Sequence, residues 1–236
     1  MNDQTASIVL PAIALTIATA IALYSWRRSR MVAIVAVVWA IISLFTARIP
    51  FFQNLDRWTD GDIVGFIAFG TVLTIPIVLF FVALWRSSAF QHFMNETPTW
   101  VLTATQVYRL TGASFLLLYL RDLLPAEIGL VNGVLDIIVG LTALPVAWML
   151  FRGIASSRNI AIAWNLLGVL DLASAFTVVT LSIFGLLELD PAPTRMGLYP
   201  LSLVSVYQVA IALCIHIYLL RRLLFADTGA SRKSIA

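Results

Sequence analysis

The sequence predicts an all-α integral membrane protein, a bundle of seven transmembrane helices with its N-terminus outside and its C-terminus in the cytoplasm. Three observations predict this fold. Of the 236 residues 61% are hydrophobic and only 11% are charged, the apolar residues form seven long runs, and basic residues gather at alternate ends of those runs. A soluble domain carries about a quarter charged residues. So few charges could not cover a surface that faces water.

The seven apolar runs follow one another along the chain with short connections between them. A helix needs about 20 apolar residues to cross about 30 Å of hydrocarbon. The runs that satisfy this length lie at about residues 7–26, 31–49, 62–85, 99–120, 127–151, 160–187 and 199–220. We therefore expect one transmembrane domain over residues 1–225 and a short basic cytoplasmic tail over residues 226–236. His92 falls in a connection that we expect to be a cytoplasmic loop.

The connections differ in their content of basic residues, which sets the orientation of a membrane protein. Ten basic residues lie on one side and four on the other; the ten are Arg27, Arg28, Arg30, Arg86, Arg152, Arg158, Arg221, Arg222, Arg232 and Lys233, and the four are Arg48, Arg57, Arg121 and Arg195. Tryptophans gather at the basic ends as an expected interfacial belt, namely Trp26, Trp85, Trp100, Trp148 and Trp164. The bias places the N-terminus outside and the C-terminus inside.

Four polar residues interrupt the apolar runs near their midpoints. Arg109 lies within the fourth run, Asp136 within the fifth, Asp171 within the sixth and Gln208 within the seventh. A charge at the bilayer centre costs about 2.5–3.5 kcal/mol on insertion scales, so these side chains should point inward and pair. We predict an ion pair between Arg109 and Asp136 on adjacent antiparallel helices, with Asp171 nearby.

Two further polar residues share helix faces with this group. Gln106 lies three residues before Arg109, and Asn132 lies four residues before Asp136, so each pair lies on one face of its helix. The candidate ligand or ion pathway therefore consists of Gln106, Arg109, Asn132, Asp136, Asp171 and Gln208. One arginine and two aspartates carry a formal charge of −1, which a proton or a bound cation would relieve. The alternative is that the polar residues only fix the register and rotation of the helices.

The residue inventory excludes several classes of function. A retinal pigment needs a lysine in the bundle, and Lys233 in the tail is the only lysine. A zinc site needs about three ligands in one place, whereas the chain has only His92, a lone helical His216 that we interpret as a packing residue, and one cysteine, Cys214. The sequence therefore predicts no catalytic residue, metal or cofactor. The pI near 9.4 does not indicate nucleic acid, because the basic residues lie at the ends of apolar runs.

A pattern between residues 106 and 140 resembles a family of uncharacterised bacterial seven-span inner-membrane proteins. Its residues are Gln106-x-x-Arg109-x-x-Gly112, then Leu124-Pro125, then Gly133-x-x-Asp136-x-x-x-Gly140. The resemblance implies a multi-pass protein of the bacterial inner membrane and brings no activity with it.

Two functions fit these observations. The first is transport of a small solute, or proton-linked transport, through the polar residues at mid-membrane depth. The second is a non-catalytic sensor or a subunit that binds another membrane protein. The expected partners are the lipid bilayer, a small solute or proton, and a membrane-protein partner or a second copy of the chain.

Overall fold

The computed structural model describes residues 3–49 and 63–225, and those residues form helices joined by short turns, with no strand among them. The chain is therefore all-α, as predicted. The predicted tail at 226–236 and Arg57 lie outside the described residues. The elements are α1 (Asp3–Trp26), α2 (Arg30–Thr46), α5 (Ile63–Arg86), α6 (Ser88–Glu96), α7 (Thr99–Thr105), the 3₁₀ helix η1 (Gln106–Gly112), α8 (Ala113–Tyr119), the π-helix η2 (Glu127–Asn132), α9 (Gly133–Phe151), α10 (Ser157–Ile183), the 3₁₀ helix η3 (Pro193–Gly197), the π-helix η4 (Val204–Val209) and α11 (Ala210–Phe225).

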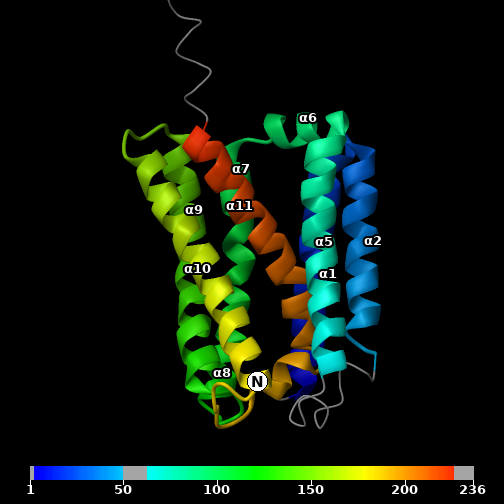
Figure 1. The fold of residues 1–236 in the computed structure, drawn as a ribbon. Coiled ribbons are helices and arrows are strands. Elements are labelled where there is room, and N and C mark those ends of the chain that lie inside the picture. The colour runs from blue at the N-terminus through cyan, green and yellow to red at the C-terminus, as the bar shows by residue number, and fades with distance from the viewer. Residues whose placement is uncertain (1–2, 50–62, 226–236) are drawn as a thin grey trace, which may run out of the picture.

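The long helices run up and down the molecule, and α11 crosses diagonally between two groups (Figure 1). One group contains α1, α2 and α5, and the other contains α9 and α10. Helix α6 lies across one end of the bundle, which we call the α6 end, and the N-terminus lies at the other, which we call the N-terminal end. Helix α10 has 27 residues and is therefore about 40 Å long at 1.5 Å per residue.

Among the described residues, four helical segments are long and apolar enough to cross a membrane: Val9–Trp26, Glu127–Phe151, Ser157–Ile183 and Val204–Phe225. A fifth is counted if the bent pair Gly70–Arg86 and Ser88–Glu96 is taken as one span. The two remaining predicted spans, at 31–49 and 99–120, do not form single long helices. Helix α2 has only 17 residues, and the run predicted at 99–120 is divided into α7, η1 and α8.

The segment that we expected to be a cytoplasmic loop around His92 is instead the helix α6, bent by 97° from the end of α5. The hydroxyl of Ser87 accepts a hydrogen bond from the backbone N–H of Phe90 at 3.2 Å and so caps its start. Phe90, Phe93 and Met94 occupy positions three and four apart and are buried against α5 and α11. The apolar face of an amphipathic helix therefore forms where we had predicted a loop.

Trp164 does not belong to the predicted interfacial belt. Its side chain is buried, its Nε1 donates to Thr142 Oγ1 at 2.9 Å, and its ring centroid lies 5.1 Å from that of His216. Trp26, Trp85, Trp100 and Trp148 are exposed at the α6 end, as predicted. Trp164 lies in the second turn of α10, on the face that points into the bundle. Its position along the chain shows that it is near a helix end, but not which face of the helix it is on.

Candidate functional site: a buried cluster around Arg109

Three of the helices that carry the polar residues lose regular α geometry where those residues lie. Arg109 and Gln106 belong to the 3₁₀ helix η1, Asn132 ends the π-helix η2, and Gln208 lies in the π-helix η4. A 3₁₀ stretch inside a longer helix often marks a hinge, and π-turns are frequent at functional sites. Membrane helices tolerate such segments where neighbouring protein surrounds the backbone.

Arg109 is the centre of the cluster and is 2% exposed. Its Nε donates to Asp136 Oδ1 at 2.6 Å, so the predicted ion pair is present. Its Nη2 donates to Asp171 Oδ2, and this second carboxylate is completely buried. One guanidinium on η1 thus holds a carboxylate from α9 and another from α10. Arginine suits this position because its planar fork presents donors in several directions at once.

The remaining nitrogen of the guanidinium faces α10 and α11. Arg109 Nη1 lies 3.4 Å from the carbonyl oxygen of Gly168 and 3.1 Å from Nε2 of His216. A guanidinium has no acceptor, so Nε2 of His216 must be the unprotonated nitrogen. The other ring nitrogen, Nδ1, lies 2.8 Å from Oδ1 of Asn165 and donates to it. His216 is therefore a neutral imidazole in this arrangement, and its proton is on Nδ1.

Asn132 lies on the other side of Asp171. Its Nδ2 is 2.8 Å from Asp171 Oδ1, 3.0 Å from the Asp171 carbonyl oxygen and 2.8 Å from Ser174 Oγ. Asp171 therefore accepts hydrogen bonds on both carboxylate oxygens, one from Arg109 and one from Asn132. Hydrogen bonds to a charged group are about twice as strong as neutral ones, so this carboxylate is held firmly in place.

The two glutamines form no hydrogen bond with the charged residues of the cluster. Gln208 Oε1 accepts from Thr111 Oγ1 at 2.7 Å, and its carbonyl oxygen accepts from the hydroxyl of Tyr108 at 3.1 Å. Gln208 therefore joins η4 to η1 beside the cluster. Gln106 is completely buried, and its amide has no hydrogen-bond partner among the described residues. Of the six predicted residues, the structure joins Arg109, Asp136, Asp171 and Asn132 in one network.

Close helix packing brings the charged residues together. A Cβ added to Gly112 would lie 2.2 Å from Asp136 Cβ, and one added to Gly140 would lie 2.7 Å from the backbone nitrogen of Leu110. A Cβ on Gly168 would lie 2.5 Å from the His216 ring and 3.0 Å from Arg109 Nη1. Glycine at these positions lets η1, α9, α10 and α11 approach as closely as small residues allow in membrane helices.

His216 and Asn165 belong to the network although the sequence does not predict them there. The sequence predicts His216 to be a lone packing residue, but its ring contacts Arg109. A signal was present on α10, where Asn165, Gly168, Asp171 and Ser174 follow one another at intervals of three residues. Such spacing places them along one face of a helix. All four contact the network around Arg109, directly or through Asn132 and His216.

The network is suited to binding a proton. Arg109, Asp136 and Asp171 together carry a formal charge of −1, and His216 adds none in the tautomer described above. Asp136 is the most accessible of the three, with 13% of its side chain exposed. Among residues 3–49 and 63–225, the structure contains no group of three His, Cys, Asp or Glu side chains placed to hold a metal ion.

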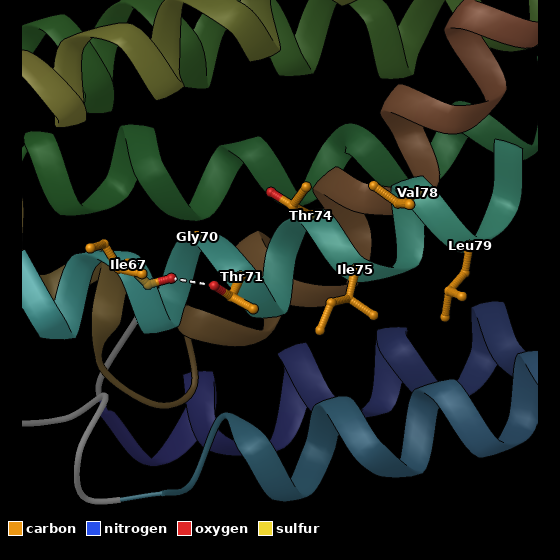
Figure 2. A pocket seen from close by; sticks show the side chains of 7 residues that line it. All are labelled: Ile67, Gly70, Thr71, Thr74, Ile75, Val78 and Leu79. Carbon is orange, nitrogen blue, oxygen red and sulfur yellow. Dashed lines mark hydrogen bonds between the residues drawn. The ribbon is translucent and has the colours of Figure 1, made fainter. Parts of the chain in front are cut away.

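A hollow of 410 Å³ lies on α5, apart from the charged cluster. Figure 2 shows Thr74 and Val78 on one side of this helix and Ile75 and Leu79 on the other. Gly70 and Thr71 complete its lining together with Ile67, whose carbonyl oxygen accepts from the Thr71 hydroxyl at 2.7 Å. Small and apolar residues thus form a shallow surface along the helix.

Comparison with known proteins places the chain in a family. No curated protein and no solved structure matches the sequence. The family described as a domain of unknown function, DUF8737, matches residues 66–224, which is more than half of the chain. That segment contains α6, η1, η2, α9, α10 and all of α11 except Phe225, and hence every residue of the charged network. The chain therefore belongs to the DUF8737 family.

Proposed function

We propose that this chain is a seven-span protein of the bacterial inner membrane, with its N-terminus outside, whose charged network binds and releases a proton during transport of a small solute. The seven spans are α1, α2, α5, the interrupted α7–η1–α8 segment, η2–α9, α10 and η4–α11. Helix α2 is short for a span, at about 25 Å. The N-terminal end then faces outward and the α6 end faces the cytoplasm, in keeping with the distribution of arginines.

One observation carries the proposal of a proton site: a single buried guanidinium is shared by two carboxylates, and its third partner is a neutral imidazole. An unbalanced negative charge at low dielectric is relieved when one carboxyl takes up a proton. Ionisable groups inside a membrane bundle pair with one another and form proton relays in pumps and transporters.

The irregular helical segments allow the proposed proton site to change its conformation. Transporters commonly place their sites where membrane helices are discontinuous, because the interrupted segments can rearrange around the bound ion. Here the three interruptions η1, η2 and η4 carry Arg109, Asn132 and Gln208. A change in the protonation of Asp171 or Asp136 alters the bonds that these carboxylates make to Arg109 on η1 and to Asn132 on η2.

The proposal is tested with purified protein in vesicles that enclose a pH-sensitive dye. Wild-type protein should pass protons when a potential is applied, and Asp171→Asn should reduce the flux to that of protein-free vesicles while remaining folded. Glu188→Gln, a change at an exposed carboxylate of the N-terminal end, should behave as wild type. Infrared spectra should show the C=O stretch of a protonated carboxylic acid that Asp171→Asn or Asp136→Asn removes. Absence of both the flux and this band would contradict the proposal.

The second candidate function is a non-catalytic sensor or a subunit of a membrane complex. The hollow on α5 favours it, because Gly70 and Thr74 have the small-xxx-small spacing that lets another membrane helix approach. This function predicts that native mass spectrometry of gently solubilised protein detects a bound partner chain. Gly70→Leu should release that chain and Asp171→Asn should retain it. A bare mass for the wild type would count against this candidate.

A further inference from the structure

Four aromatic rings at the α6 end are paired with arginines; Trp26, Trp85 and Trp148 are exposed and Tyr24 is half-buried. The guanidinium carbon of Arg28 lies 4.2 Å from the ring centroid of Tyr24, that of Arg30 lies 5.8 Å from Trp26, that of Arg86 lies 4.3 Å from Trp85, and that of Arg152 lies 5.9 Å from Trp148. These distances suit cation–π contacts. We call the four pairs the arginine–aromatic collar.

The collar comes from separate helices that end at the same level. Its aromatic residues lie in the last turns of α1, α5 and α9, and its arginines lie at or just beyond those ends, or at the start of α2. Trp26, Trp85 and Trp148 are more than half exposed. Helix α6 lies across the same end with its apolar face buried. The collar therefore lies at one end of the bundle and includes residues from both groups of helices.

The collar arginines have no acidic partner within the described part of the chain. None of the four takes part in an ion pair there. The same end also carries Arg27, Arg158, Arg221 and Arg222, and its one acid among the described residues, Glu96, pairs with His92 at 3.0 Å. The N-terminal end has a different balance of basic and acidic residues. It carries Arg48, Arg121 and Arg195 together with Asp122, Glu127, Glu188 and Asp190.

We propose that the arginine–aromatic collar binds the headgroups of anionic phospholipids. Indole rings prefer the boundary between headgroups and hydrocarbon, and a ring stacked beneath a guanidinium holds its donors at the level of the lipid phosphates. Guanidinium donors match phosphate oxygens in pairs. Charge complementarity therefore selects an anionic lipid as the occupant. The proposal rests on the membrane placement proposed above and is independent of the proton site.

The test uses the fluorescence of the collar tryptophans in the full-length protein. Protein in phosphatidylcholine bilayers is titrated with small fractions of brominated phosphatidylglycerol or of brominated phosphatidylcholine with the same acyl chains. Bromine quenches tryptophans that it approaches, so the two curves give the relative affinity of the collar for the two headgroups. We expect a preference for phosphatidylglycerol of about fivefold for each arginine that a headgroup contacts, and a smaller one at high salt.

A matched pair of variants locates the effect. Arg86→Gln with Arg152→Gln should remove most of the preference, whereas Arg121→Gln with Arg195→Gln at the N-terminal end should leave it unchanged. Equal quenching by the two lipids, or a preference that both pairs reduce alike, would overturn the proposal and leave an acidic protein partner as the alternative. The quenching measurement does not depend on proton flux. Its result therefore tests the lipid site independently of the proposed proton site.

Discussion

His216 shows how much of the site depends on one hydrogen atom. The ring lies between Arg109 on η1 and Asn165 on α10, and it is completely buried. Because Arg109 can only donate, the ring is held as the neutral Nδ1–H form. Protonation of Nε2 would remove this acceptor and place two cations side by side. His216 therefore positions Arg109 on the side opposite the two carboxylates.

The tautomer can be measured directly, because the chain has only two histidines. Replacing the exposed His92 by Gln leaves His216 as the sole imidazole. We expect nitrogen NMR of this variant to show one protonated nitrogen, Nδ1, at neutral pH. His92→Gln with Arg109→Gln should weaken that preference, because the donor to Nε2 is lost. A doubly protonated ring, or the Nε2–H form, in the Arg109 protein would contradict the hydrogen-bond assignment.

At the scale of elements, the close contact of η1 with α9 places Arg109 beside Asp136. The contact has no room for a methyl group at Gly112, where an added Cβ would lie 2.2 Å from Asp136 Cβ. Interiors packed at this density do not absorb extra atoms without shifts of the backbone. The ion pair therefore depends on a residue that carries no charge.

Gly112→Ala should destabilise the protein by about 1–3 kcal/mol, the usual cost of overpacking. Gly70→Ala is the matched control, since nothing lies within 4 Å of a Cβ at that helical position. The control should be neutral or slightly stabilising, because alanine favours a helix over glycine. Thermal unfolding in detergent compares the two. Equal effects of the two substitutions would show that η1 and α9 are not in this tight contact.

The α6 end has a clamp of its own. Arg222 on α11 donates to the carbonyl oxygens of Thr97 at 2.6 Å, Asn95 at 3.2 Å and Met94 at 3.5 Å. These bonds satisfy carbonyls at the C-terminal end of α6, where an isolated helix leaves them unpaired. The same helix, α11, also carries His216, so the clamp and the site share one element.

Arg222→Met should loosen α6 without unfolding the bundle. Hydrogen bonds to a charged group are worth about 1.5–3 kcal/mol each, so amide hydrogen exchange over residues 88–97 should accelerate. Arg221→Met, a change at the exposed neighbouring arginine, should leave that exchange as in the wild type. Similar exchange in both variants would mean that the buried apolar face alone holds α6.

At the scale of the whole molecule, charge is divided between two ends. Most of the described arginines lie at the α6 end, and the five described acidic residues outside the network and α6 lie at the N-terminal end. Such an asymmetry orients a membrane protein with its basic end in the cytoplasm. The division concerns the whole bundle, because no single helix carries enough charge to decide it.

Orientation can be read by labelling single cysteines. Cys214, the only native cysteine, is replaced by Ser, and a cysteine is then introduced at exposed Ser156 of the α6 end or exposed Glu188 of the N-terminal end. In intact cells a membrane-impermeant maleimide should label Glu188→Cys, and it should label Ser156→Cys only after the membrane is permeabilised. The reverse pattern would invert the proposed topology, and labelling of both would show that the two ends share one side.

The sequence by itself determined the fold class and the residues that have to be buried together. Lipid dissolves apolar side chains and penalises charges at any position, so composition alone identifies long apolar helices and the few polar residues within them. The pairing of Arg109 with Asp136 followed from that penalty, since a cation in the fourth run had few possible partners.

Only the tertiary structure decided which polar groups meet. The 3₁₀ and π segments rotate the faces of η1, η2 and η4 away from those of a regular helix, so spacing in the sequence did not show that Gln106 stays apart from the network. His216 and Asn165 join it because Gly168 leaves room for the imidazole ring. Helix α6 folds back over the bundle because its buried face packs on α5 and α11. Each of these outcomes depends on the rotation and packing of neighbouring helices, which hydropathy along one chain does not encode.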